Sequence, residues 1–318
     1  MPKYYLFLAS LLFIQIGFAQ PVFEEKAGIL IIEAEHPVTD ASDWGDWSLK
    51  TSINGYNGEG HIEFDDGSMS DRSPGSQLKY RFKINNSGSY KLFLRAHKRL
   101  EGAEPDKCND AFVRMDGDFS SGNPEVATHI LGMNTKLYGG AQSRWGWASN
   151  LDGNGADHTP AIYNFKAGET YTFYLVGRSV RFNIDRICFI NTSFSDDPEG
   201  AGYLPESLLL GRAYDDSTAP EIVITDTSRT RDYWKMIGYG TDVMLNIAAD
   251  VSDTGSGIAM VQCFLDGAPF AFDTRAPYAF AELKLDRYGE HTVYLKALDN
   301  TYNSAISDTV VFHVASPT

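Results

Sequence analysis

HTPAIYNFKAGETYTFYLVGRSVRFNIDRICFI, residues 158–190, is the stretch that decides the fold of the chain around it. Apolar and polar side chains alternate in three runs, which Ala167–Glu169 and Gly177–Ser179 separate. Alternation of period two, interrupted by glycine turns, is typical of antiparallel strands that pack on one face. Asp185 places a carboxylate inside an apolar strand, where burial is costly unless a partner binds it. We therefore expect a bound cation at Asp185.

Two further carboxylates lie near the start of the chain, in IIEAEH, residues 31–36. On a strand, Glu33 and Glu35 project to the same face because they are two residues apart. Like charges side by side repel each other unless a cation lies between them. The alternative is an edge strand whose glutamates are solvated, and this segment alone does not decide between the two.

The residues between these segments predict more strands, at 61–64, 77–84, 88–97 and 110–115. Asn85–Gly88 and Asp116–Gly117 have the composition of hairpin turns. No stretch in this half has a sustained helical repeat. We therefore expect residues 20–192 to form an all-β domain, a β-sandwich.

The first residues predict export from the cytoplasm. Lys3 precedes an apolar run over residues 4–18, and Gly17–Ala19 offers small residues where a signal peptidase cleaves. The run is short for a membrane span and contains Gln15. We therefore expect a signal peptide over residues 1–19 and a mature protein that is secreted, periplasmic or at the cell surface. A membrane anchor is the alternative.

Charge and cysteine content narrow the classes of partner. The formal net charge of −15 disfavours nucleic acid and anionic membranes, although a local basic cluster can still bind an anionic polysaccharide. Acidic excess also suits calcium, which prefers oxygen ligands. Cys108, Cys188 and Cys263 are too few for a disulfide framework, and either one Cys108–Cys188 bridge or buried free thiols fit the sequence.

The second half of the chain predicts a separate module. Residues 193–216 are rich in Ser, Asp, Pro and Gly and form the expected linker. Regular short strands follow over residues 217–318. Segments such as FLDG (264–267), APY (276–278) and GEHTV (289–293) resemble bacterial immunoglobulin-like domains, which implies a spacer or assembly surface. Asp250, Asp253 and Asp299 could bind an ion, but we expect ordinary turn aspartates there.

Several segments of the first half resemble the jelly-roll carbohydrate-binding modules of families 6 and 35. These are IEAE (32–35), GYNGEGHI (55–62), GSY (88–90), GETY (168–171) and FNIDRI (182–187). Together, in this order, they cover the whole first domain. The resemblance implies a jelly-roll fold and a structural calcium ion that joins the first strand to the last. Glu33, Glu35 and Asp185 would be its carboxylate ligands, against the alternative that Asp185 pairs with Arg186 or Arg181.

The same resemblance implies a sugar-binding cleft among loops at one end of the sandwich. Sugar rings need flat apolar faces framed by polar groups. The expected ligand residues are two loop pairs of tryptophans with three polar neighbours: Trp44, Trp47, Trp145, Trp147, Arg144, Asn150 and Arg178. Where these modules often carry an asparagine before the last strand, this chain has Arg178. An arginine there would favour a carboxylate or sulfate on the sugar.

No sequence motif predicts an enzyme. The chain has no nucleophile elbow, no paired-histidine zinc motif and no phosphate-binding glycine loop. We therefore expect a non-catalytic protein that binds a polysaccharide, in association with polysaccharide-degrading enzymes. The alternatives are a structural adhesin, a glycoside hydrolase component, or a polysaccharide lyase. The lyase would use a base, an acid and a charge neutraliser from this set: His158, Tyr163, Tyr171 and Arg178.

Overall fold

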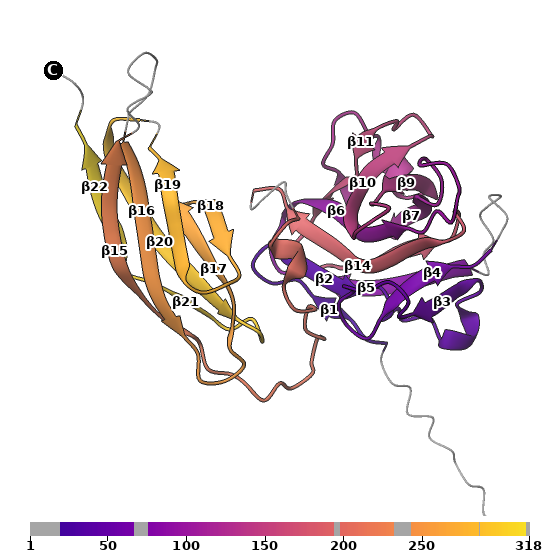
Figure 1. The fold of residues 1–318 in the computed structure, drawn as a ribbon, viewed down its shortest axis with the longest axis horizontal. Helices are drawn as coiled ribbons and strands as arrows, with labels where there is room; N and C mark the ends of the chain where they lie inside the picture. The colour runs from indigo at the N-terminus through magenta and orange to yellow at the C-terminus, as the bar shows by residue number, and fades with distance from the viewer. Residues whose placement is uncertain (1–19, 67–75, 194–197, 232–242, 286, 316–318) are drawn as a thin grey trace, which may run out of the picture.

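The protein is an all-β molecule, as the sequence predicts (Figure 1). The computed structural model describes residues 20–66, 76–193, 198–231, 243–285 and 287–315. The predicted signal peptide over residues 1–19 lies outside these ranges. Within them, no helix has the length and apolar character needed to cross a bilayer.

The strands up to residue 191 belong to one sheet. They are β1 (Phe23–Glu24), β2 (Ile29–Glu33), β3 (Trp47–Lys50), β4 (His61–Phe64), β5 (Gln77–Lys83), β6 (Gly88–Lys98), β7 (Asp110–Asp116), β8 (Ser120–Ser121), β9 (Thr135–Gly139), β10 (Gly146–Asp152), β11 (Thr159–Pro160), β12 (Ile162–Phe165), β13 (Thr170–Val176) and β14 (Phe182–Asn191). Short helical turns occur at η1 (Ala41–Asp43) and α1 (Thr128–Leu131). The expected strands at 61–64, 77–84, 88–97 and 110–115 are therefore confirmed as β4, β5, β6 and β7.

This sheet rolls over on itself to form a sandwich. The hydrogen-bonded path runs β1-β5-β13-β7-β9-β10-β6-β14-β4-β3. The ring of Phe189 on β14 lies 5.2 Å from Phe82 on β5 and 5.5 Å from Phe173 on β13. β14 is a neighbour of neither β5 nor β13 in this path, so the Phe189 ring meets the other two rings across the core. One apolar cluster, with residues from both halves, fills the space between them.

β14 organises the first domain, because it pairs with β2, β4 and β6. Its first nine residues are all buried. The register of β14 against β6 shifts between Ile184 and Arg186, so Asp185 lies at a β-bulge. The neighbouring strand β2, which pairs with β14, ends at Glu33, and Glu35 lies just beyond that end. Glu33 and Glu35 are only 3% and 7% exposed, so the alternative of solvated glutamates is wrong.

The strands of the second half pair only with one another within the described ranges. They are β15 (Glu221–Arg231), β16 (Val243–Ser252), β17 (Ile258–Leu265), β18 (Ala268–Asp273), β19 (Tyr278–Lys284), β20 (Gly289–Asp299), β21 (Ser304–Ile306) and β22 (Val310–Val314). One sheet is β15-β16-β19; the other is β18-β17-β20, with β21 and β22 also on β20. Their shared apolar core makes this half a second sandwich. The exact limits proposed for the domains stay a prediction.

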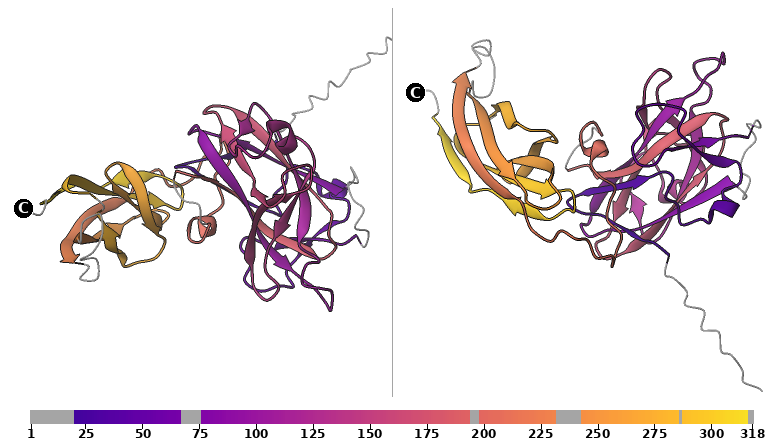
Figure 2. Two further views of the ribbon diagram at one scale, coloured as in Figure 1. Left: turned by 90° about the horizontal axis from the view of Figure 1, so that it is seen from above. Right: turned by 60° about the horizontal axis from the view of Figure 1, so that its bottom comes forward.

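The two halves meet through a third apolar cluster. It joins Ile31 and Phe93 on the outer face of the first sandwich to Met260 and Tyr302 of the second. Between them lies the segment that contains η3 (Ala201–Tyr203). The Tyr302 hydroxyl donates a hydrogen bond of 2.8 Å to the carbonyl of Pro205. Figures 1 and 2 show β17 and β18 on the side of the second sandwich that faces the first.

Candidate functional site

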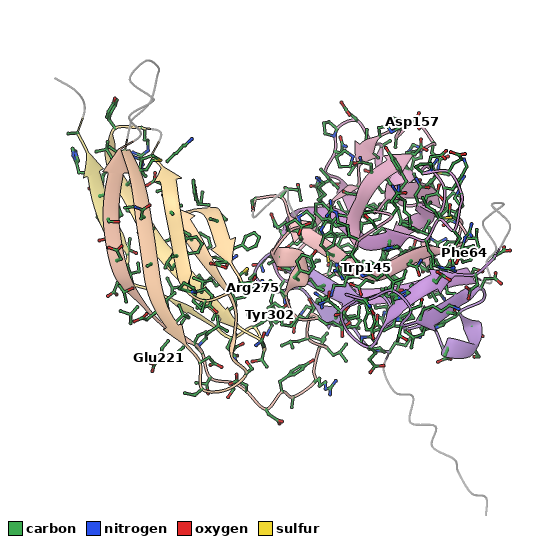
Figure 3. The ribbon with its side chains drawn as sticks, in the orientation of Figure 1. Phe64, Trp145, Asp157, Glu221, Arg275 and Tyr302 are labelled. Atoms are coloured by element: carbon green, nitrogen blue, oxygen red, sulfur yellow. The ribbon has the colours of Figure 1, made fainter. Side chains whose placement is uncertain are left out.

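Two of the four predicted ligand tryptophans are buried in the first sandwich. Trp47 is 3% exposed, lies 5.2 Å from the ring of Phe64, and donates its indole N–H to the carbonyl of Ser76. Trp145 is 7% exposed and donates its indole N–H to the carbonyl of Asn54. Its ring, labelled in Figure 3, packs against two residues of β6: the His97 ring at 5.6 Å and the Arg95 guanidinium at 5.3 Å. The role of these two rings in a sugar site stays a prediction that the geometry does not support, because both rings are buried.

The other two tryptophans are partly buried. The Trp44 indole N–H donates to the carbonyl of Thr39, and its ring packs against the core. Trp147 is covered by the segment after β14: Tyr203 meets its ring edge-on at 5.8 Å, and its indole N–H donates to Glu199. The tryptophans therefore fix loops and the interdomain segment, and the four rings do not form one sugar platform.

The polar residues of the predicted site lie apart from one another. Arg144 is exposed in the loop before β10, and Asn150 is exposed on β10 itself. Arg178 follows β13 and forms an ion pair with the buried carboxylate of Asp110. Arg178 also lines a cavity.

This cavity opens on the outward face of the sheet half formed by β13, β7, β9 and β10. The strand registers place Asp152 opposite Lys136, and Lys136 opposite Phe112. Arg114, two residues after Phe112, therefore projects to the same face. The cavity has a volume of about 540 Å³, within the range of small-ligand sites. It is lined by Phe112, Arg114, Gly132, Met133, Asn134, Lys136, Asp152, Gly153, Asn154 and Arg178.

The cavity gathers cations in an acidic protein. Three of its lining residues are cationic and one is a carboxylate, whereas the whole chain has a formal net charge of −15. Arg114 and Arg178 each have a carboxylate partner outside the lining, Asp116 at 3.8 Å from Arg114 and Asp110 beside Arg178. The Arg114 guanidinium lies over the ring of Tyr174, with its Cζ 4.0 Å from the ring centroid. Lys136 forms an ion pair with Asp152. A planar cation held over an aromatic ring is well suited to pair with a carboxylate or sulfate.

Sequence reasoning missed Arg114 and Lys136. Arg114 lies in the strand DAFVRMD, where it alternates with the buried residues Val113 and Met115. That alternation predicts an outward-facing cation. It does not predict that Lys136 and Arg178, 22 and 64 residues later, would reach the same face.

The three carboxylates predicted as calcium ligands each have partners in the protein. Arg186 binds Glu33 through two nitrogens, with the Nε–Oε2 pair at 3.0 Å. Arg95 donates from Nη1 to Oδ2 of Asp185 at 2.6 Å. Glu35 accepts backbone N–H groups of the loop after Asn57 through Oε1. The pairing expected as an alternative, Asp185 with Arg186 or Arg181, is therefore replaced by Asp185 with Arg95.

These carboxylates do not fit a shared calcium ion. In the described part of the chain, their oxygens do not come together as a group within 4.8 Å. Burial raises the pKa of the Glu33 carboxyl to about 7, although Arg186 opposes the shift. Burial likewise raises the pKa of Asp185, against the effect of Arg95. Calcium at these residues stays a prediction that the geometry does not support.

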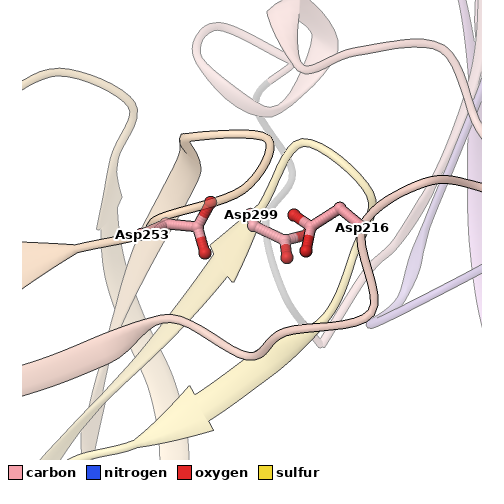
Figure 4. Close-up of side chains that lie close together, drawn as sticks. All are labelled: Asp216, Asp253 and Asp299. Atoms are coloured by element: carbon pink, nitrogen blue, oxygen red, sulfur yellow. The ribbon is translucent and has the colours of Figure 1, made fainter.

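A different group of acidic residues lies at the start of the second sandwich. Oxygens of Asp216, Asp253 and Asp299 lie within 4.8 Å of one another (Figure 4). Asp250, which the sequence suggests as an ion ligand together with Asp253 and Asp299, is not a member of this group. Asp253 accepts the N–H groups of Gly255 and Gly257, at 3.0 and 2.7 Å. Such bonds are typical of turn aspartates, which is the role that we expect for them.

The residues considered for a polysaccharide lyase do not converge. Tyr163 and Tyr171 are 0% and 1% exposed, and burial raises the pKa of each phenol, so neither is placed to act as a base. His158 is exposed and contacts Tyr138, whereas Arg178 pairs with Asp110. All three cysteines are buried free thiols, so a bridge between Cys108 and Cys188 is absent.

Comparisons with known proteins give structural likeness only. No family model and no curated protein matches the chain. A family 35 carbohydrate binding module from Clostridium thermocellum matches 54% of this chain and 99% of its own, with 14% identity and a TM-score of 0.28. The fibronectin(III)-like modules of Clostridium thermocellum CbhA match 30% of this chain and 95% of theirs, with 22% identity and a TM-score of 0.22.

A larger protein also shares part of this structure. The Podospora anserina GH26-CBM35 beta-(1,4)-mannanase matches over 52% of this chain, with 14% identity and a TM-score of 0.32. This chain spans only 28% of the mannanase. At these identities and TM-scores, the likenesses carry no argument about what this protein binds or catalyses.

Proposed function

We propose that this protein is an exported, non-catalytic glycan-binding protein that holds an acidic sugar in the cavity on the face of β7, β9 and β10. The observation that carries the proposal is the cluster of three cations, Arg114, Lys136 and Arg178, around a cavity of about 540 Å³. Phe112 lines the cavity and the Tyr174 ring lies against the Arg114 guanidinium, so apolar surface and charge are combined.

This arrangement suits recognition of a sugar better than chemistry on it. Ligand sites combine apolar surface with a few oriented polar groups, and the two arginines that line this cavity favour a planar anion. The cavity contains one carboxylate, Asp152, whereas glycosidases use two across a cleft. The sequence segments of the first domain that resemble carbohydrate-binding modules, such as GYNGEGHI (55–62) and FNIDRI (182–187), support the same function. The second sandwich would then be a spacer or a surface for assembly with polysaccharide-degrading enzymes.

The test compares matched pairs of polymers that differ only in charge. Uronate polymers are compared with their methyl esters, and sulfated polymers with their desulfated forms, by affinity electrophoresis and calorimetry. We expect retention by the acidic member of a pair and weaker binding as salt screens the charge. Equal binding to the neutral member would refute the acidic specificity, and binding to none would refute the glycan-binding function. Release of unsaturated or reducing ends would refute a non-catalytic role.

The first variant is Arg114→Gln, which removes the charge and keeps much of the length of the side chain. We expect it to weaken binding of the acidic polymer about 10-fold to 100-fold, the range for loss of a hydrogen bond to a charged group. The matched control is Arg144→Gln, because Arg144 is exposed and does not line the cavity. Equal effects of the two substitutions would contradict the assigned position of the site.

A further inference from the structure

We infer that two buried arginines, Arg95 and Arg186, take the place of a divalent cation in joining β14 to its surroundings: Arg95 joins it to the loop at residues 55–57, and Arg186 joins it to β2. The chain would then carry its own cations at a position where related folds are expected to bind a metal. This inference does not depend on the proposed glycan site.

The first arginine gathers a set of oxygens that would suit a metal ion. Arg95 Nη1 donates to Oδ2 of Asp185 at 2.6 Å, to the carbonyl of Gly55 at 3.0 Å and to Oδ1 of Asn57 at 3.0 Å. A carboxylate, a carbonyl and an amide oxygen are ligands that calcium prefers. Here they converge on one nitrogen of a guanidinium that is itself only 6% exposed.

Neighbouring groups hold Arg95 in this position. Its guanidinium lies 4.9 Å from the ring centre of Tyr203 and 5.3 Å from that of Trp145. The other oxygen of Asp185 accepts the N–H of Asn57 at 2.8 Å. Because Asp185 is fully buried and both of its oxygens are bonded, its charge is already balanced within the protein.

The second arginine, Arg186, neutralises the carboxylate of Glu33 on β2. Arg186 is 4% exposed and binds Glu33 with a two-nitrogen contact. Its remaining nitrogen donates to the carbonyls of Gly202 at 3.1 Å and Leu204 at 2.6 Å. Arg186 therefore joins β14 to β2 and also to the segment that leads to the second sandwich.

Little space is left for an ion between the two glutamates. A β-carbon added to Gly58 would lie 2.4 Å from Oε1 of Glu35 and 3.1 Å from Cδ of Glu33. The backbone of Gly58 thus packs against both side chains. In the described ranges, Oε2 of Glu35 has no hydrogen-bond partner. Every other carboxylate oxygen of Glu33, Glu35 and Asp185 accepts a hydrogen bond.

The inference predicts a first domain whose stability is indifferent to calcium. The experiment measures thermal unfolding of the full chain in EDTA and in calcium chloride. It uses an Asp253→Asn background, which removes one of the three clustered carboxylates of the second sandwich and so weakens any calcium binding there. We expect the two midpoints to agree within about 1 °C, because a covalently attached cation cannot be chelated. A midpoint that falls by several degrees in EDTA and recovers with calcium would overturn the inference.

A second measurement tests whether the Arg95 guanidinium occupies a site that calcium would otherwise fill beside Asp185. Arg95→Ala leaves Asp185 buried without its cation, so we expect a fall in the midpoint of about 10 °C. We also expect calcium to raise the midpoint of this variant and not that of the control Arg114→Gln. Arg95→Lys, which keeps a cation, should lose less stability than Arg95→Ala and serves if the alanine variant does not fold. A calcium response equal in the variant and the control would contradict the inference.

Discussion

His61 is a residue whose surroundings predict a response to acid. Its ring is fully buried, lies 5.4 Å from that of Trp145, and accepts the N–H of Ile53 at Nε2. Burial lowers the pKa of this imidazole from 6.5 to about 4. Between these values the unfolded chain binds a proton that the folded chain does not bind. Stability is therefore complete above about pH 6.5 and falls as the pH drops toward 4.

We expect this histidine to account for as much as about 3 kcal/mol of the acid destabilisation. The measurement is the urea midpoint of unfolding as a function of pH. In His61→Gln, an amide oxygen can still accept the N–H of Ile53 but takes up no proton, so the midpoint should fall less steeply with acid. The idea would be wrong if both proteins lost the same stability between pH 6.5 and pH 4.

The loop tryptophans show why ligand residues are hard to identify from neighbouring letters. Glycine and polar residues flank Trp47 and Trp145 in the sequence, as they flank many sugar-binding aromatics. Each indole N–H instead donates to a backbone carbonyl that is 29 or 91 residues away in the chain. A buried indole satisfies its N–H in this way, so local composition does not distinguish the two roles.

At the scale of elements, the sandwich depends on the corner between β9 and β10. Gly139 ends β9 with φ of +146°, and a β-carbon there would lie 2.7 Å from Cα of Ala148. The register of β10 on β9 shifts by a bulge just after Ala148. The close approach of the two backbones at this corner requires glycine.

Gly139→Ala should therefore destabilise the first domain strongly. The matched control is Gly168→Ala, because Gly168 has φ of +87° and no atom within 4 Å of its added β-carbon. Both variants incur the conformational cost of about 1 kcal/mol, and Gly139→Ala should lose about 1–3 kcal/mol more through crowding. Denaturant unfolding measures both. Equal losses would show that the corner tolerates a side chain.

At the scale of the whole molecule, the two sandwiches share an apolar contact. Met260 is fully buried, and it clusters with Ala201 and Leu204 of the connecting segment and with Ile31 of the first sandwich. The neighbouring Val261 belongs to the core of the second sandwich. Adjacent residues on β17 thus serve two different cores, as the alternation of a strand requires.

This alternation predicts different effects for two neighbouring substitutions. Met260→Asp places a charge in the shared contact, so the sandwiches should separate and X-ray scattering should give a larger radius of gyration. Val261→Ala should lower the unfolding midpoint of the second sandwich by removing core volume, with no change in scattering. A Met260→Asp protein with unaltered scattering would show that the sandwiches are held together elsewhere.

The sequence alone determined the all-β class and the main strands of the first sandwich. These features follow from local alternation and turn composition, which short segments contain in full. Only the tertiary structure decided which charges are partners and which aromatics are buried. Arg95 meets Asp185 across 90 residues, and Arg186 meets Glu33 across 153. Such pairs depend on how the strands are ordered and packed, and no single segment encodes that arrangement.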